Sequence, residues 1–176
     1  MTDEEIIRGC IQKDLRSQKQ LYDRYSSKMM GVCLRYASNK EEAQDLLQDG
    51  FIKVFQNISS FKFSGEFAGW IKKIMVNNAL EQIRKRKIVF EKLEDDFADG
   101  ESEHHTGESQ HDVKDLLRML QQLPAGYRTV FNLYAIEGYT HKEIAEWLEI
   151  EEGTSKSQYA RARAYIQKML AGVKTV

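Results

Sequence analysis

The chain has 176 residues, 41% of them apolar and one of them proline, which suits one domain or two small helical ones. Its 26 basic and 27 acidic residues give a formal net charge of -1, which argues against a partner gripped by bulk charge alone. No segment approaches the roughly 20 apolar residues of a membrane span, and the acidic N-terminus lacks the basic and apolar stretches of a secretory signal. We therefore expect a cytoplasmic protein without membrane insertion.

The charges are distributed unevenly along the chain. Residues 1–90 carry 16 Lys and Arg against 11 Asp and Glu, and residues 113–176 carry 9 against 7. Residues 91–112, between them, carry one Lys and 9 acidic residues. The near-neutral total therefore conceals two basic segments separated by a strongly acidic one.

Apolar residues recur at helical spacing in both basic segments, and no period-two alternation is long enough to indicate a strand, so we expect an all-α protein. In the first segment the predicted helices lie near residues 3–12, 14–37, 40–58 and 66–88. Asn39 can cap the third helix, whose apolar stripe faces a core and consists of Leu47, Phe51, Val54 and Ile58. An unusually aromatic loop follows at residues 59–67. Cys10 and Cys33 have no CxxC partner, and we expect both to be reduced, partly buried thiols.

Residues 92–110 combine low hydrophobicity with high charge, a composition that cannot bury enough surface to order itself. We predict an acidic flexible linker here, joining two small helical domains at residues 1–91 and 111–176. Three histidines in this region have no helical i, i+4 pair and no matching carboxylates: His104, His105 and His111. We expect them to be solvated, and we predict no metal site, no cofactor and no enzymatic activity, since no phosphate-binding Gly-Lys loop is present either.

The last third of the chain begins with a helix that ends before Pro124, whose missing N–H is not needed in the first turn of a following helix. Further helices are predicted near residues 125–137, 140–148 and 152–171. Thr140 and Glu143 form a capping box for the second of these. Its inward residues are Ile144, Ala145 and Leu148, and the small Ala145 lets another helix cross at close range. A tight turn at residues 149–151 then leads to the last helix.

The last predicted helix has two different faces. The inward face carries Ser155, Tyr159, Ala162 and Ile166. The opposite face carries small residues surrounded by cations: Lys156, Ser157, Ala160, Arg161, Arg163, Ala164 and Lys168. This face suits the major groove of DNA, because small side chains allow close approach, Arg can donate two bonds to a guanine edge and Lys contacts phosphates. A solvated basic face is the alternative, and the short helix and tight turn before it favour DNA binding.

A second group of cations lies at the end of the helix predicted over residues 66–88: Arg84, Lys85, Arg86 and Lys87. The helix dipole also favours cations there, so they are weak evidence by themselves. Beside an aromatic loop they indicate a site for single-stranded nucleic acid, in which bases stack on rings while cations follow the backbone. Because Phe61, Phe63 and Phe67 cannot all be surface groups, we expect at least one of them in the core.

Two blocks of sequence resemble the extracytoplasmic-function (ECF) sigma factors of bacterial RNA polymerase, in the sigma-70 family. The first is DLLQDGFIKVFQNISSF followed by FAGWIKKIMVNNALEQIRKRK, and the second is LPAGYRTVFNLYAIEGYTHKEIAEWLEIEEGTSKSQYARAR. Both blocks in this order, separated by an acidic linker, are more specific than a helix-turn-helix alone. The resemblance implies a promoter-melting helical bundle (sigma region 2) over residues 1–91 and a helix-turn-helix domain (sigma region 4) over residues 111–176. It implies that the linker threads the positively charged channels of the polymerase.

The resemblance also implies partners and roles for individual residues. The partners would be core RNA polymerase, promoter DNA as duplex and melted non-template strand, and an anti-sigma factor. Polymerase binding would fall to Asp45, Gln48 and Asp49. Recognition and melting of the downstream promoter element would fall to Phe61, Lys62, Phe63, Ser64, Trp70, Asn77, Arg84 and Lys85. Recognition of the upstream element would fall to Lys156, Ser157, Ala160, Arg161 and Arg163.

Four positions depart from the family's pattern: Glu81 stands for Asp, Glu149 for Gly, Ser155 for Val and Gln158 for Arg. We expect the fold to be unaffected and the preferred promoter sequence to change, with Gln158 and Ala160 as the positions that alter base preference. The leading hypothesis is an alternative sigma factor that directs promoter-specific transcription initiation. The alternative is a helix-turn-helix regulator that binds duplex DNA as a dimer, which would give no role to the aromatic loop or to Asp45 and Asp49.

Overall fold

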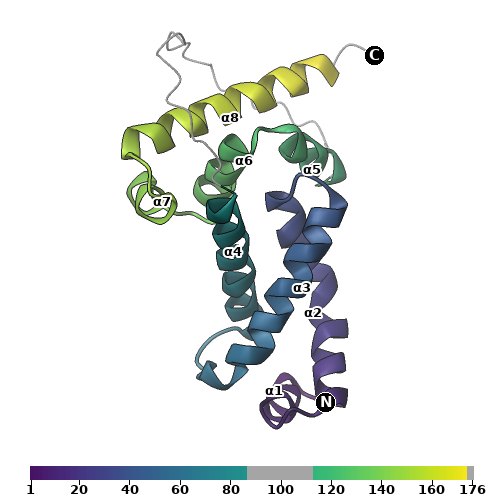
Figure 1. Cartoon of the computed structure of the whole chain (residues 1–176). Helices are drawn as coiled ribbons and strands as arrows, with labels where there is room; N and C mark the ends of the chain where they lie inside the picture. The colour runs from purple at the N-terminus through teal and green to yellow at the C-terminus, as the bar shows by residue number, and fades with distance from the viewer. Residues whose placement is uncertain (87–112, 174–176) are drawn as a thin grey trace. The chain divides into compact units, whose positions relative to one another are not determined.

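The computed structural model describes residues 1–86 and 113–173, and the chain forms two compact units, Met1–Ile88 and Val89–Val176 (Figure 1). All regular structure in the described residues is helical, so the predicted all-α fold of two small helical domains is confirmed. The linker predicted over residues 92–110 and the histidines His104, His105 and His111 lie outside the described residues. The domain boundaries at residues 91 and 111 stay predictions.

The N-terminal unit is a bundle in which α2 packs against three other helices and α3 packs against α4. Thr2, Asp14 and Asn39 accept hydrogen bonds from backbone N–H groups at the starts of the first three helices. Helix α4 ends at Lys85, with Arg86 as its C-cap, before the predicted residue 88. The elements are α1 (Asp3–Ile11), α2 (Leu15–Tyr36), α3 (Lys40–Asn57), the 3-10 turn η1 (Ile58–Ser60) and α4 (Phe67–Lys85).

The core of this unit is built from the apolar faces of its four α-helices. The stripe predicted on α3 is buried at every position: Leu47, Phe51, Val54 and Ile58. Cys10 and Cys33 are free and buried, as predicted, and burial raises the pKa of the Cys10 thiol to about 11 and that of Cys33 to about 12. Thiols that are so rarely ionised are poor nucleophiles, which fits a packing role.

The C-terminal unit packs α6 and α7 against the long helix α8. A small core under α8 consists of Leu120, Leu123, Ala162 and Ile166. Pro124 is the N-cap of α6, one position before the first helical residue. The elements are α5 (Val113–Gln122), α6 (Ala125–Phe131), the π-helical turn η2 (Asn132–Ile136), α7 (His141–Leu148) and α8 (Glu152–Val173).

The helix predicted over residues 125–137 changes its winding halfway. The side chain of Asn132 donates to the carbonyl of Arg128 at 2.9 Å, a backbone acceptor within the preceding turn. The N–H of Glu137 then bonds the carbonyl of Asn132, five residues back, at 2.9 Å. Single π-turns of this kind often occur at functional sites, and this one positions Tyr134, described below.

We expect Gly50→Ala to destabilise the N-terminal unit. A Cβ added at Gly50 would lie 2.2 Å from Sδ of Met75, which is only 1% exposed, so the Met75 side chain would have to repack within the core. Overpacking costs about 1–3 kcal/mol, whereas the gain in helix propensity is at most about 1 kcal/mol.

The matched control is Gly31→Ala, since an added Cβ there meets nothing within 4 Å. This variant should gain stability from helix propensity alone. Urea unfolding followed by the fluorescence of Trp70, in a Trp147→Phe background, measures both. A midpoint for Gly50→Ala at or above that of Gly31→Ala would contradict the tight α3–α4 contact.

Candidate nucleic-acid and protein interfaces

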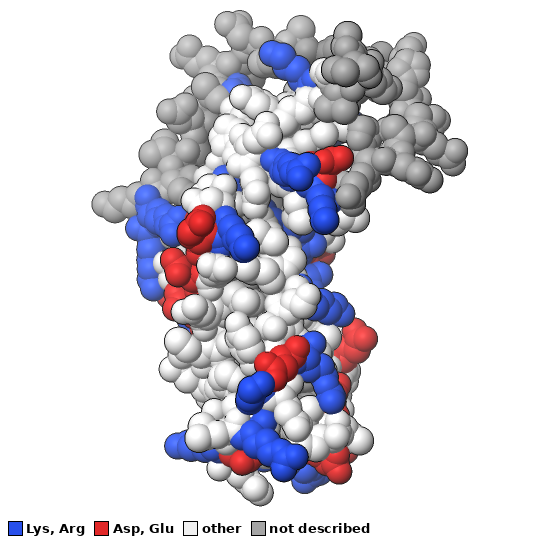
Figure 2. Space-filling view, turned by 90° about the vertical axis from the view of Figure 1, so that its right-hand side faces the viewer, with Lys and Arg blue, Asp and Glu red and all other residues white. Residues whose placement is uncertain are grey.

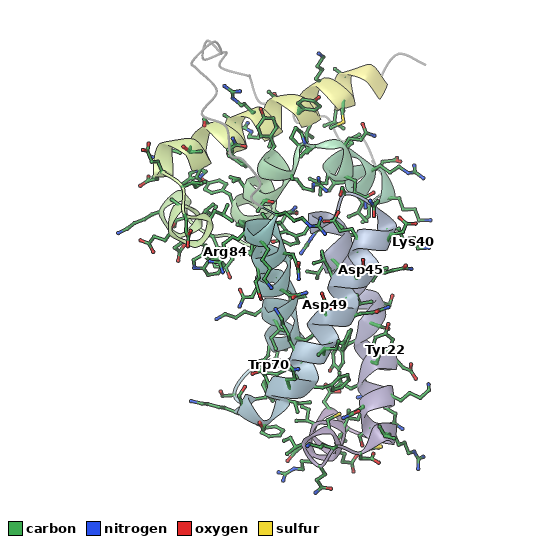
Figure 3. The ribbon with its side chains drawn as sticks, in the orientation of Figure 1. Tyr22, Lys40, Asp45, Asp49, Trp70 and Arg84 are labelled. Carbon is green, nitrogen blue, oxygen red and sulfur yellow. The ribbon has the colours of Figure 1, made fainter. Side chains whose placement is uncertain are left out.

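An acidic face runs along α3. Asp45, Gln48 and Asp49 are all exposed, because Leu46 and Leu47 between them turn inward, and Figure 3 shows the two aspartates following one another along the helix. Together they line a hollow of about 260 Å³ between α3 and the end of α4. The three residues that the sequence predicts for protein binding therefore share one surface.

One end of this hollow is fixed by an ion pair between Glu42 of α3 and Arg86, just after α4. Partial burial raises the pKa of Glu42, but hydrogen bonds from Ser38 and the charge of Arg86 outweigh it and hold the pKa below its usual value. The carboxylate stays charged near neutral pH. Asp45 and Asp49 thus line a hollow at which the Glu42–Arg86 ion pair joins α3 to the end of α4.

The aromatic loop before α4 has a buried base and an exposed tip. Phe61 and Phe67 are 8% and 6% exposed, whereas Phe63 is 47% exposed. Phe61 contacts the rings of Phe63, Phe67 and Trp70 at centroid distances of 5.3, 4.9 and 5.6 Å. Phe61 therefore supports the loop from beneath, and the expectation of at least one core Phe is confirmed by Phe61 and Phe67. The role of Phe61 in the downstream-element site stays a prediction.

The tip of the loop has an uncommon backbone. Phe63 has φ of 55° and Gly65 has φ of 106°, both in the left-handed region. Glycine adopts this region readily, but a bulky residue such as Phe does so at a cost. Lys62 and Ser64 are exposed on either side of Phe63, and Trp70 is half-buried, stacked on Phe67 at 5.6 Å. The exposed members form a continuous polar and aromatic tip.

The outer face of α4 carries the predicted Asn77, Arg84 and Lys85, all exposed. Figure 3 shows Trp70 near the start of this helix and Arg84 near its end. Lys85 pairs with Glu81 at 2.7 Å, and Glu81 also accepts a hydrogen bond from Lys53 of α3. The hydrogen bonds from Lys53 and Lys85 lower the pKa of Glu81 to about 2. Lys53 was not predicted, since only the packing of α3 on α4 brings it here.

The turn between α7 and α8 has the geometry of a helix-turn-helix. The capping box is confirmed: Thr140 N–H donates to the Glu143 carboxylate at 2.8 Å, and Glu143 N–H donates to the Thr140 hydroxyl at 3.2 Å. Ala145 is buried, as the close crossing of helices requires. Glu149 adopts φ of 55° after the last turn of α7, the conformation that favours glycine. The departure at Glu149 therefore leaves the turn in place with a residue that fits it less well.

The two faces of α8 are as predicted. Ser155, Ala162 and Ile166 are buried and Tyr159 is half-buried. Gln158, which was predicted on neither face, is 2% exposed and lies one turn along from the buried Ser155 and Thr154. Its effect on base preference stays a prediction. The outward face has Arg161 half-buried and the other members exposed: Lys156, Ser157, Ala160, Arg163, Ala164 and Lys168.

The outward cations Lys156 and Arg163 have partners within the unit. Lys156 pairs with Glu152 at 2.8 Å, and the guanidinium of Arg163 lies 5.9 Å from the ring centre of Tyr159. Both contacts are on the exposed surface, where such pairs contribute little to stability. These contacts therefore orient Lys156 and Arg163, and both cations can still exchange their present partners for a phosphate.

A cluster around His141 joins α7 to α8 and was not predicted. The ring of His141 stacks on Tyr134 at 4.2 Å, and its Nδ1 lies 2.9 Å from the hydroxyl oxygen of Ser155, which is fully buried. Burial, aided by Lys156, lowers the pKa of His141 below its usual value. Ser155, in place of the family's Val, thus gives the buried face of α8 a polar link to the start of α7.

Two family models match the chain: Sigma-70 region 2 over residues 21–88, and Sigma-70, region 4 over residues 114–166. Each falls within one of the two units. The helical bundle with its aromatic loop and the helix-turn-helix unit together define a sigma factor, the class of subunit that directs transcription initiation by bacterial RNA polymerase.

Within that class the relatives identify one group. The ECF sigma factor SigW of Bacillus subtilis is 30% identical over 165 residues, which cover 85% of this chain and 87% of the relative. The sigma-H factor of Pseudomonas aeruginosa is 27% identical, and the match covers 96% of this chain and 93% of that relative. The chain belongs to the ECF sigma factors and is an alternative sigma factor. The ECF sigma factor SigE of Mycolicibacterium smegmatis is also 30% identical, and this chain spans 64% of the length of that protein.

Among solved structures, the sigma factor RpoE of Bartonella quintana, in complex with the anti-sigma factor NepR, is similar with a TM-score of 0.51. The sequences are 25% identical, and the match covers 87% of this chain and 96% of that one. Separately, none of the helices in the described ranges has the length and apolar character needed to cross a membrane.

We expect Glu149→Gly to stabilise the C-terminal unit by up to about 1 kcal/mol, because glycine adopts positive φ without the steric cost that a Cβ brings. The fluorescence of Trp147, in a Trp70→Phe background, reports unfolding of this unit. Glu149→Ala is the control: it removes the same side chain but keeps the Cβ, and should not be stabilised. Equal stabilisation by Ala and Gly would show that the side chain, and not the backbone conformation, is unfavourable.

Proposed function

We propose that this sigma factor contacts core RNA polymerase through the acidic face of α3 and contacts a promoter at two separate places, one on each unit. The observation that carries the proposal is the difference in exposure between the two faces of α8. Its small and cationic residues are exposed while the opposite face is buried, which is what a helix in a major groove requires.

The upstream element would be contacted by the exposed face of α8. Arg161 can donate to a base edge, while Lys156 and Arg163 contact phosphates beside it. Ser157 and Ala160 are small enough to let the helix backbone approach the bases. Since Gln158 is buried, the proposal assigns direct contact with the bases to these outward residues.

The downstream element would be held by the tip of the aromatic loop and the outer face of α4. Phe63 offers an exposed ring on which an unpaired base can stack, a contact worth about 1–3 kcal/mol. Lys62 and Ser64 flank it, and Trp70, Asn77, Arg84 and Lys85 extend the surface along α4. A strand separated from its complement would thus be bound by rings and cations together.

Neither unit carries enough charge to hold DNA tightly alone. Each neutralises only a few phosphates, so the free chain should bind DNA weakly and with strong dependence on salt. Polymerase binding would present both units to the promoter at once, and the effective concentration of the second contact would then make the whole complex tight. The chain would therefore act as a specificity subunit and perform no bond chemistry of its own.

An anti-sigma factor is the regulatory partner we propose. The support is the Bartonella RpoE complex with NepR, whose sigma factor shares the fold. The alternative of a dimeric helix-turn-helix regulator gains no support, because it leaves the region 2 match, the exposed Phe63 and the acidic face of α3 without a role.

Arg161→Ala should lower transcription from cognate promoters by roughly tenfold, since a bidentate contact to a base is worth about 1–3 kcal/mol. Affinity for core polymerase should not change, because Arg161 lies on α8, outside the acidic face of α3. Run-off transcription and a polymerase pull-down measure the two effects. Arg118→Ala removes an exposed cation of the same unit that lies on α5, outside the face of α8, and should change neither. Loss of polymerase binding by Arg161→Ala would remove it from the DNA face.

Reversing Asp45 and Asp49 to Lys together should weaken polymerase binding by about 10- to 100-fold, because a like charge placed in an interface costs several kcal/mol. Competition for core polymerase against the wild-type chain gives the ratio. Asp23→Lys on α2 is the control, since it reverses an exposed charge away from the hollow. An unchanged affinity for the double variant would place the polymerase contact elsewhere.

A further inference from the structure

The first helix of the chain has no assigned role. It lies outside the region 2 match, which begins at residue 21, yet it is firmly built into the N-terminal unit. Thr2 and Glu5 form a capping box at its start, and its inward side chains are buried: Ile6, Ile7 and Cys10. Gly9 packs so closely on α2 that an added Cβ would lie 2.1 Å from the hydroxyl oxygen of Ser17. Helix α1 is thus a fixed element and not a loose extension.

Helix α1 is connected to the base of the aromatic loop through α2. The Tyr25 hydroxyl donates to Asp3 at 2.6 Å, and Arg24 pairs with the same carboxylate at 2.5 Å. The ring of Tyr25 meets Phe67 edge to face, with centroids 5.5 Å apart, and Phe67 packs on Phe61 at 4.9 Å. A continuous line of contacts therefore runs from the start of α1 to the rings beneath the loop.

A second connection reaches the tip of the loop directly. The guanidinium carbon of Arg8 lies 5.7 Å from the ring centre of Phe63. Its Nε and Nη2 both donate to Oε1 of Glu4, at 3.0 and 2.6 Å, which fixes the guanidinium on the outer face of α1. Arg8 is therefore oriented before any ligand arrives, and it lies against one of the most exposed large rings of the N-terminal unit.

Phe63 needs such a support. Its φ of 55° is unfavourable for a bulky residue, and its ring is too exposed to be held by burial. A cation over an aromatic ring contributes an attraction even at an exposed site. The Phe63 ring contacts both the Phe61 ring and the guanidinium of Arg8, while 47% of its surface stays exposed.

We propose that α1 is part of the downstream-element site and that Arg8 is a positioning residue, which holds the Phe63 ring in the orientation that stacks on an unpaired base. The inference rests on the proposed stacking role of Phe63. It adds Arg8, which lies outside the region 2 match, to this site. Arg8 would affect DNA binding by orienting the Phe63 ring and not by contacting a phosphate.

The contact itself is tested on the free chain by NMR. A ring above the guanidinium shifts the side-chain δ and ε proton signals of Arg8 to higher field, and the shift should vanish in Phe63→Leu. Unshifted signals in the wild-type chain would overturn the proposal before any DNA is added.

The functional test uses holoenzyme reconstituted with core polymerase and fork-junction DNA whose single strand carries a promoter mapped with the wild-type protein. Arg8→Ala should weaken binding of this DNA by about two- to five-fold, the range for an exposed cation–π contact. Arg16→Ala, which removes an exposed cation close to α1 that has no contact with Phe63, should leave binding unchanged. Thermal unfolding should be alike for the two variants.

A double-mutant cycle separates positioning from simple charge. In a Phe63→Leu background, Arg8→Ala should cause no further loss, because its effect acts through the ring. An undiminished loss in that background would mean that Arg8 contacts DNA itself, which overturns the proposal. If Phe63→Leu weakens fork binding and Arg8→Ala does not, the positioning role is wrong and the stacking role stands. If neither does, the stacking role of Phe63 fails as well.

Discussion

The functional faces of this sigma factor are held outward by the burial of the faces opposite to them. On α3, the packing of Leu47, Phe51 and Val54 fixes the rotation of the helix and so leaves Asp45 and Asp49 in solvent. Burial of a Leu, Val or Phe side chain is worth about 1.5–3 kcal/mol, whereas an exposed charge contributes almost nothing to folding. The site residues can therefore change with little effect on stability, and the apolar residues behind them cannot.

The same logic applies to α8, where the buried face is partly polar. Ser155 and Gln158 are buried beside Ala162, and the hydroxyl of Ser155 is within hydrogen-bond distance of His141. A hydrogen bond has directional requirements that apolar packing lacks, so it restricts how α8 can rotate or slide against α7. The outward face is consequently set by geometry as well as by burial.

Acidic partners accompany the cations at both proposed DNA sites. Lys85 pairs with Glu81 on α4, and Lys156 pairs with Glu152 on α8. Figure 2 shows the same interspersion of basic and acidic side chains on the face that it presents. Because these pairs are exposed, a phosphate can replace the carboxylate at little cost. The arrangement keeps the lysines oriented in the free chain while limiting attraction to DNA of any sequence.

Most of the fold was predictable from local signals. Helical spacing, the caps at Asn39 and Thr140, and the two-sided pattern of α8 depend on residues a few positions apart, and the structure confirms them. The features that were not predicted concern contacts between elements. The burial of Phe61 follows from rings on α4, and the Lys53–Glu81 and His141–Ser155 contacts each join two helices. No spacing rule in one helix can indicate which residue of another helix lies opposite.

The two turns that lead into the proposed DNA sites both have a strained backbone, but they differ in whether glycine could relieve the strain without loss of function. Phe63 and Glu149 both adopt left-handed φ without being glycine, at a cost of about 1–2 kcal/mol each. At position 149 glycine would adopt the turn conformation without strain, and the proposed DNA contacts need no side chain there. At position 63 glycine would relax the backbone but remove the ring, together with the partner of Arg8 and the surface on which a base can stack. Strain at Phe63 is therefore the consequence of placing a ring at the tip of a tight loop, and its retention there is best explained by what the ring contacts.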